Sequence, residues 1–210
     1  MSIFGGLFRL KRGTSHQKRN DVVERDAELD SHLKLATFGA GCFWGTEKYF
    51  TKDFTKKHPQ GIHSSSVGFM SSEKNAVDNP TYYQVCSGVT GHVEVCELVY
   101  DSGKIEYEDL CRFFFTFHDC TQYNRQGNDK GPQYASVIFV HDDEQMEIAR
   151  KVKDELQKRI DDGKIKGFQE DNVRTKIARA TVFYKAEDEH QQYLALNPSG
   201  YCNHRIRFSW

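Results

Sequence analysis

At 210 residues the chain is long enough to fold around one sizeable hydrophobic core, and its 38% hydrophobic and 28% charged residues are typical of a soluble globular protein. A net charge of -1 argues against nucleic acid and anionic membranes as partners, and no apolar run is long enough to span a bilayer. Six cysteines at irregular spacing, without a Cys-x-x-Cys pair, are unlike the dense disulfide framework of a small secreted domain. We therefore expect a cytoplasmic monomer with reduced thiols.

The first 32 residues differ in composition from the rest of the chain. The first twenty contain five basic residues and no acidic residue, whereas residues 21–30 are rich in acids. This segment is either a solvated extension or a mitochondrial presequence, because presequences are basic, poor in acids and amphipathic. We favour the extension, since the segment has few hydroxyl residues and only a short helical stripe. Residues 33–210 are then expected to form one folded domain.

Hydrophobic periodicity divides the first half of this domain into alternating strands and helices. The expected strands are 33–38, 63–70 and 92–101, and the expected helices are 42–54 and a short one that Pro80 opens after the polar run 71–80. In the third strand Val95 and Val99 share one face, while Leu98 and Tyr100 share the other. A strand with two apolar faces is an interior strand of a sheet.

The second half of the domain predicts two more strands and three more helices. The helices are 107–118, 142–158 and 186–196, the strands are 134–140 and 176–184, and a polar loop occupies 119–133. Asp142 is the expected N-cap of the long helix, whose inner stripe comprises Met146, Ala149, Val152 and Leu156. Helices segregated against one mixed sheet indicate an α+β two-layer sandwich, which we expect to be ferredoxin-like.

Cys42 lies in the segment GAGCFWG (39–45), where a strand gives way to a helix. A cysteine in this position is a buried core thiol, a metal ligand or a nucleophile. The flanking glycines would let backbone amides approach a bound group, and the positive end of the helix dipole would favour a thiolate. A zinc site is disfavoured, because the other cysteines fall at no zinc-like spacing and the nine histidines include no His-x-x-x-His pair. We interpret Cys42 as a nucleophile.

Glu94 is the second candidate, because it begins a strand on the face that it shares with Cys96 and Leu98. Partial desolvation there would raise the pKa of its carboxyl group and make it a general acid near neutral pH. The alternative is a glutamate that is simply exposed at the end of the strand.

Aromatic side chains are candidates for the walls of a site around these two groups. Phe43 and Trp44 beside the thiol would form an apolar pocket, and the hydroxyl groups of Tyr82 and Tyr134 would donate hydrogen bonds to a polar oxygen within it. Each of them is also a candidate core residue. Asp129 lies in the long polar loop, and a loop of that length inside a compact domain is usually functional.

A cysteine hydrolase or transferase is the alternative enzyme class, with His92 or His190 as the base that activates Cys42. This interpretation gives no role to Glu94 or to Cys202.

Five segments resemble, in order, the successive motifs of the peptide methionine sulfoxide reductase A family. They are GCFWG (41–45), NPTYYQVCSGVTGHVE (79–94), HDCTQYNRQGNDKGPQYAS (118–136), AEDEHQQYL (186–194) and NPSGYC (197–202). One such pentapeptide would be a weak signal, whereas five in register are a strong one. On this resemblance residues 33–210 would form a catalytic reductase domain. A non-catalytic binder of oxidised methionine is disfavoured, because the thiol, the acid and both tyrosines are retained.

The resemblance implies reduction of the S epimer of methionine sulfoxide, free or in proteins, with no bound cofactor and no metal. Matched motif positions make Cys42 the nucleophile and Glu94 the acid that protonates the sulfoxide oxygen. The other matched positions would bind the substrate: Tyr82 and Tyr134 at its oxygen, Phe43 and Trp44 around its methyl group, and Asp129 on its polar side.

The same chemistry would leave a sulfenic acid on Cys42, with which a second thiol condenses. We favour Cys202, because its glycine-containing segment should be mobile enough to reach the site, and a disulfide needs its Cα atoms within about 7 Å. Cys86, one helical turn after Tyr82, is the alternative. No cysteine follows Cys202, so we expect thioredoxin to reduce the Cys42 to Cys202 disulfide directly.

Two segments depart from the family pattern. GFMSS (68–72) replaces an aromatic residue followed by glycines, which puts the shape of that loop in doubt. Cys120 occupies a position where the family usually has proline.

Overall fold

A computed structural model describes residues 32–210. The interpretation of residues 1–31 as an extension or a presequence lies outside the described residues. At the centre is a six-stranded sheet in the order β7-β6-β1-β3-β2-β8. Its strands are β1 (Leu33–Ala40), β2 (Ile62–Met70), β3 (Val93–Asp101), β6 (Ser136–Val140), β7 (Lys176–Arg179) and β8 (Tyr184–Lys185). Only β6 and β7 are parallel, so the sheet is mixed and the fold is α+β, as predicted.

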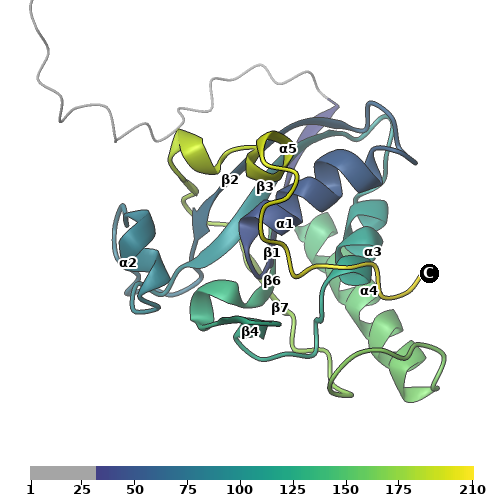
Figure 1. Cartoon of the computed structure of the whole chain (residues 1–210). Coiled ribbons are helices and arrows are strands. Elements are labelled where there is room, and N and C mark those ends of the chain that lie inside the picture. The colour runs from purple at the N-terminus through teal and green to yellow at the C-terminus, as the bar shows by residue number, and fades with distance from the viewer. Residues whose placement is uncertain (1–31) are drawn as a thin grey trace, which may run out of the picture.

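The main helices α1, α3 and α4 lie on one side of this sheet (Figure 1). The helical elements are α1 (Phe43–Lys48), which continues into the π-helical turn η1 (Tyr49–Phe54), α2 (Tyr82–Cys86), α3 (Tyr107–Phe117), α4 (Asp143–Asp161) and α5 (Tyr193–Leu196). In the part of the chain that the structure describes, none of them combines the length and the apolar character needed to cross a membrane.

The main hydrophobic core lies between the sheet and helices α1 and α3. Phe38, on β1, is fully buried, and its ring stacks on Phe50 and Phe114 with 4.9 and 5.1 Å between ring centroids. Because β1 lies between β3 and β6, the chain that leaves its C-terminal end starts from the middle of the sheet. Cys42 is in that position.

Two predicted helices are confirmed in place and in their buried faces. The helix α3 buries an apolar stripe that includes Leu110 and Phe114. Asp142 caps α4, since its Oδ1 accepts a 2.7 Å hydrogen bond from the backbone N–H of Gln145. The predicted inner stripe of α4 is also buried, with Met146 at its margin.

The last predicted strand, 176–184, is wrong, because the structure divides it between opposite edges of the sheet. β7 pairs with β6, whereas β8 pairs with β2 at the other end of the strand order. Between them the chain crosses the second face of the sheet, where Ala180 and Phe183 pack against a smaller apolar cluster. A segment that crosses one face of a sheet can show the same alternation of apolar and polar residues as a strand within the sheet. The sequence could therefore not distinguish the two cases.

The last predicted helix, 186–196, is also wrong. It consists of the 3₁₀ turn η3 (Asp188–His190) and the short helix α5, with Gln192 between them at a φ of 53°. The backbone N–H and the side-chain amide of Gln192 donate to the buried carboxylate of Glu47 at 2.8 and 2.7 Å. These contacts with α1 hold Gln192 in the left-handed region, where a right-handed helix cannot continue.

The polar loop 119–133 contains structure of its own. A hairpin of β4 (Arg125–Gln126) and β5 (Asp129–Lys130) is followed by the 3₁₀ turn η2 (Pro132–Tyr134). Pro132 opens this turn, so the strand β6 begins at Ser136 and not at Tyr134 as predicted.

Ser71, in the segment GFMSS, and Cys120 are both buried. The hydroxyl group of Ser71 donates to the backbone carbonyl of Gly91 at 2.6 Å and accepts from the backbone N–H of Glu73 at 3.0 Å. This serine therefore ties the end of β2 to the turn that precedes β3. Cys120 is fully buried, and its backbone carbonyl accepts from the backbone N–H of Arg174.

Candidate active site

Cys42 is the N-cap of α1 and follows a sharp change in chain direction at Gly41, whose φ is 91°. A side chain at Gly41 would overlap with Gln126, and a side chain at Gly45 would overlap with the ring of His204. The space beside these glycines is thus filled by other residues of this chain. The interpretation that these glycines let backbone amides approach a bound group stays a prediction.

The surroundings of Cys42 favour the thiol over the thiolate. Burial raises the pKa of Cys42 well above its ordinary value, and the charge of Glu94 raises it further. The backbone N–H groups of Trp44 and Gly45 lower this pKa, as expected for the start of a helix, but they do not outweigh burial. The predicted thiolate is therefore wrong for the resting site, because the neighbouring carboxyl group and the desolvation could not be read from local sequence.

Glu94 lies on β3 and is 1% exposed, so the alternative of a glutamate exposed at a strand end is wrong. Its Oε2 accepts a 3.0 Å hydrogen bond from the backbone N–H of Phe43, the residue after Cys42. Burial raises the pKa of Glu94 to about 8, against the effect of the Phe43 N–H and with a further contribution from the charge of Asp129. At neutral pH the carboxyl group therefore carries a proton that it can donate.

Tyr82, on α2, and Tyr134, at the end of η2, bring two hydroxyl groups toward this acid. Burial raises the pKa of both groups, and the charge of Glu94 contributes in each case. The Tyr82 hydroxyl lies near the thiol of Cys86, the last residue of α2, and each group shifts the pKa of the other. Both hydroxyl groups stay protonated at neutral pH, so both remain hydrogen-bond donors.

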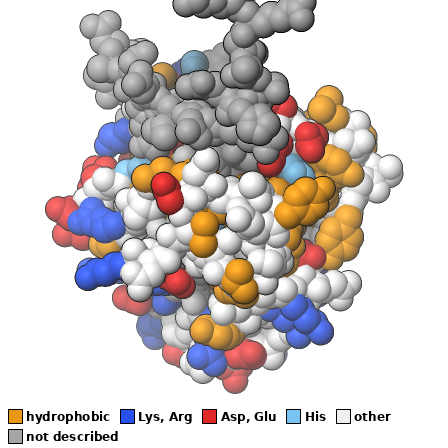
Figure 2. All heavy atoms as spheres, turned by 90° about the vertical axis from the view of Figure 1, so that its left-hand side faces the viewer, with side chains coloured by type: hydrophobic (Ala, Val, Ile, Leu, Met, Phe, Trp, Pro, Cys, Tyr) orange, Lys and Arg blue, Asp and Glu red, His pale blue; other side chains and the backbone are white. Residues whose placement is uncertain are grey.

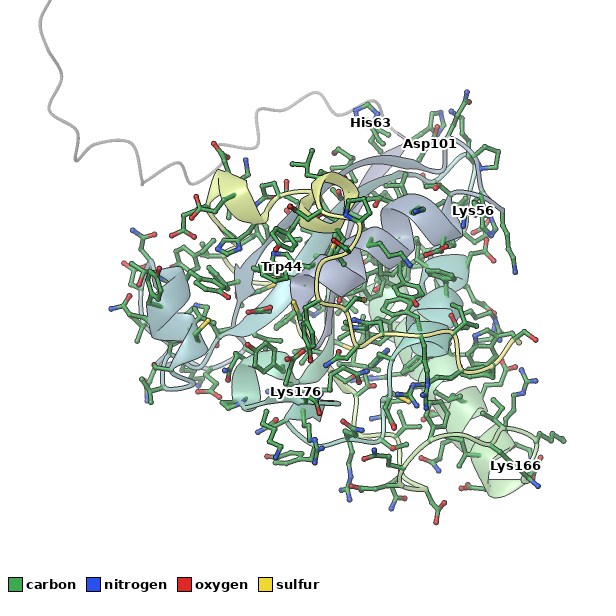
Figure 3. The ribbon with its side chains drawn as sticks, viewed as in Figure 1. Trp44, Lys56, His63, Asp101, Lys166 and Lys176 are labelled. Atoms are coloured by element: carbon green, nitrogen blue, oxygen red, sulfur yellow. The ribbon has the colours of Figure 1, made fainter. Side chains whose placement is uncertain are left out.

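A cluster of aromatic rings forms the apolar side of the site. The ring of Phe43 is buried, with its centroid 5.9 Å from that of Phe69 and 5.6 Å from that of His190. Trp44 stacks on Tyr193 with 3.9 Å between centroids, and its indole Nε1 is buried without a hydrogen-bond partner among the described residues. Figure 3 shows Trp44 at the start of α1, beside the segment that carries α5.

Asp129 contacts the residues on both sides of Cys202. Its Oδ1 accepts from the hydroxyl group of Tyr201 at 3.2 Å, and its Oδ2 accepts from the side-chain amide of Asn203 at 3.0 Å. Asn203 also donates to the backbone carbonyl of Gln126 at 2.7 Å. We call this arrangement the Asp129 clasp: Asp129, Gln126, Tyr201 and Asn203.

Hydrogen bonds hold the chain on both sides of Cys202, although the thiol itself is exposed. Beyond the Asp129 clasp, the backbone N–H groups of Arg205 and Arg207 donate to carbonyl groups at the end of α3, at 3.0 and 2.8 Å. The ring of Trp210 packs on the guanidinium group of Arg112, and its Nε1 donates to the Arg112 carbonyl. The segment that the sequence suggests is mobile is thus anchored on both sides of Cys202 by distant parts of the chain.

Neither imidazole ring that the hydrolase interpretation needs forms a hydrogen bond with Cys42 among the described residues. His92 lies against Tyr184 and bonds through Nδ1 to the carbonyl of Thr90. His190 stacks on Tyr82 with 4.3 Å between centroids. Within residues 32–210 no hydrogen bond joins either ring to Cys42, and no cluster of three or more candidate ligands could hold a metal ion.

The face that carries α2 exposes apolar side chains next to the site. Tyr83 and Val89 are 85% and 80% exposed, and Tyr83 directly follows Tyr82. Figure 2 looks onto this side of the molecule and shows several apolar side chains on its surface.

Sequence reasoning missed His204, whose Nδ1 lies 3.8 Å from the Sγ of Cys202. It also missed the partners of Asp129 in the clasp. A local signal was present, because alternate residues of an extended chain project to the same side, and His204 stands two positions after Cys202.

Comparison with known proteins gives a consistent result. A family model described as "Peptide methionine sulfoxide reductase" matches residues 34–209. The chain is 44% identical over 172 residues to peptide methionine sulfoxide reductase MsrA of Methanothermobacter thermautotrophicus, covering 82% of this chain and 92% of that protein.

Solved structures agree with this match. The reduced form of Mxr1 from Saccharomyces cerevisiae superposes with a TM-score of 0.74 at 35% identity, covering 86% of this chain and 95% of that chain. A structure of Mxr1 in complex with Trx2 shares the fold, with a TM-score of 0.55 at 23% identity over 89% of this chain and 99% of that chain.

Proposed function

The chain belongs to the peptide methionine sulfoxide reductase family and is an oxidoreductase, and on that premise we propose that it reduces the S epimer of methionine sulfoxide, free or in proteins, to methionine. The observation that carries this proposal is the protonated carboxyl group of Glu94, bonded at 3.0 Å to the residue that follows Cys42. A buried acid fixed beside a cysteine suits the reduction of a sulfoxide, since its oxygen is a poor leaving group until it gains a proton.

In the first step, the sulfur of Cys42 attacks the sulfur of the sulfoxide. Glu94 gives its proton to the sulfoxide oxygen, and the hydroxyl groups of Tyr82 and Tyr134 donate hydrogen bonds to it. The S–O bond of the substrate breaks as the oxygen moves to Cys42, which becomes a sulfenic acid while methionine leaves. The proton of the Cys42 thiol returns to Glu94, so the acid is restored.

We further propose that the aromatic cluster selects the substrate. Phe43 and Trp44 would enclose the methyl group, and Asp129 would support the polar side of the pocket. The exposed apolar residues Tyr83 and Val89, next to Tyr82, support a protein as well as a free amino acid as substrate.

In the second step, the thiol of Cys202 condenses with the sulfenic acid to give a Cys42 to Cys202 disulfide and water. Thioredoxin would reduce this disulfide by dithiol exchange, so that the electrons come from an external reductant and not from a bound cofactor. The likeness to Mxr1 supports this partner, because Mxr1 has been observed in complex with Trx2.

The proposal also includes the type of fold, the oligomeric state and the cellular location. The order β6-β1-β3-β2 with antiparallel neighbours supports a ferredoxin-like core with helices layered on the sheet. We propose a monomer, and a cytoplasmic location in keeping with reduced thiols.

Methionine production from each sulfoxide epimer, with dithiothreitol as reductant, tests this function. The wild-type protein should convert the S epimer, and Cys42→Ser should convert neither. Cys111→Ala is the matched control, because Cys111 is a buried thiol in α3, and it should keep its activity. An active Cys42→Ser protein, or a wild-type protein that prefers the R epimer, would overturn the proposal.

A further inference from the structure

The imidazole ring of His204 connects Cys202 to the strand that ends beside Cys42. Its Nε2 lies 2.6 Å from the backbone carbonyl oxygen of Ala40, and its Nδ1 lies 3.8 Å from the Sγ of Cys202. A carbonyl oxygen only accepts hydrogen bonds, so Nε2 must carry the hydrogen. In a neutral ring Nδ1 is then an acceptor, and it is directed at the thiol.

The ring is neutral at physiological pH. His204 is 7% exposed, and burial lowers its pKa to about 4. The positive charges of Arg207 and Lys48 act in the same direction, while the hydrogen bond to Ala40 opposes them. The acceptor at Nδ1 is thus present at neutral pH.

Packing fixes the ring in this orientation. Gly45 has no side chain to displace it, and the rings of Tyr49 and Phe117 lie 6.1 and 5.7 Å from it between centroids. The Tyr49 hydroxyl group donates to the backbone carbonyl of His204 at 3.1 Å. Both the ring and the backbone of His204 are therefore held.

Cys202 is held from the other side by the Asp129 clasp, through its neighbours Tyr201 and Asn203. The pKa of Tyr201 is raised by burial, by Asp129 and by the charges of both Cys42 and Cys202. Tyr201 therefore lies within electrostatic range of both sulfur atoms. Hydrogen bonds therefore hold the chain on both sides of Cys202.

We propose that His204 is a positioning residue for the Cys202 thiol: its Nδ1 accepts a hydrogen bond from the thiol and so orients the sulfur as the Cys42 to Cys202 bond forms. This inference rests on the proposed function, in which Cys42 carries a sulfenic acid. The Sγ of Cys202 attacks the Sγ of Cys42, the S–S bond forms and the S–O bond breaks. The thiol proton goes to the departing hydroxide, which leaves as water. The thiol sulfur is oxidised, and the sulfenic sulfur is reduced.

Rapid-mixing single turnovers with the S epimer separate the two chemical steps. Methionine formation reports the attack by Cys42, and loss of a dimedone-reactive sulfenic acid reports the attack by Cys202. His204→Phe keeps the ring volume and removes both nitrogens, while His204→Gln restores an amide that can donate to Ala40 and accept from Cys202.

We expect methionine formation within twofold of wild type in both variants. Loss of the sulfenic acid should be at least tenfold slower in His204→Phe and should recover in part in His204→Gln. Dithiothreitol-driven turnover, which bypasses Cys202, should stay near wild type, whereas thioredoxin-driven kcat should fall.

His63→Phe is the matched control, because it makes the same substitution at an exposed histidine of β2. It should form the disulfide at the wild-type rate. Wild-type disulfide formation in His204→Phe, or an equal slowing in His63→Phe, would overturn the role of His204. If His204→Phe does not fold, a selective slowing of the disulfide step in His204→Gln still supports it, and wild-type rates there overturn it. Failure of wild-type methionine formation would instead refute the proposed function.

Discussion

The backbone N–H of Phe43 donates a 3.0 Å hydrogen bond to the buried carboxyl group of Glu94. Phe43 follows Cys42 in the first turn of α1, whereas Glu94 lies on the interior strand β3. This bond therefore fixes the acid relative to the nucleophile. Burial desolvates the carboxyl group and keeps a proton on it at neutral pH, although the Phe43 N–H acts in the opposite direction.

The pH dependence of the first step should follow Glu94. Its pKa is raised to about 8, so the protonated form persists up to that pH and disappears above it. We expect kcat/KM with dithiothreitol to fall as pH rises through about 8. Glu94→Gln should be slower by roughly 100-fold or more, because it cannot donate the proton. Its profile should also lack the alkaline decrease, and an unchanged decrease in this variant would contradict the assignment.

Trp44→Ala should weaken substrate selection without unfolding the protein. Removing a fully used buried aromatic ring costs about 3 kcal/mol, which corresponds to a decrease in kcat/KM of roughly 100-fold. Tyr193→Phe keeps the ring that stacks on the indole and serves as the control. Steady-state kinetics should be measured beside circular dichroism. Wild-type kinetics in a folded Trp44→Ala protein would mean that the indole is only structural.

Cys202→Ser should still produce one equivalent of methionine but should lose turnover with thioredoxin. The serine hydroxyl group cannot form the disulfide, while a small thiol can reduce the sulfenic acid directly and restore turnover. Cys86→Ser is the matched control and should cycle normally, although Cys86 lies near Tyr82. Peptide mapping after one turnover identifies the bridge. A Cys42 to Cys86 linkage would show that α2 and not the C-terminal segment resolves the intermediate.

Gly45→Ala should destabilise the protein, because the added carbon would overlap with the ring of His204. Overpacking of this kind costs about 1–3 kcal/mol in the free energy of unfolding. Gly103→Ala, at a more open position, should change it by less than about 0.5 kcal/mol. Urea unfolding measures both values. Equal stabilities of the two variants would mean that the His204 ring moves aside freely.

The helices, strands and caps that depend on a local pattern of residues could be predicted from the sequence alone. The strand that leads to Cys42, the helix that follows it and the cap at Asp142 all follow from periodicity and capping chemistry within a few residues. Glu94 was a candidate acid from its place at the start of a strand, and the resemblance to the reductase family assigned it that role.

Contacts between side chains that are far apart in the sequence became apparent only in the tertiary structure. Residues 176–184 were read as one strand, because a segment that crosses a sheet has the same alternation as a strand within it. The protonated state of Cys42 depends on burial and on Glu94, 52 positions away. The position of Cys202 depends on contacts of its segment with Asp129 and of its thiol with His204. Desolvation and hydrogen bonding act through space, so they become defined only when the packed chain has excluded water from around these groups.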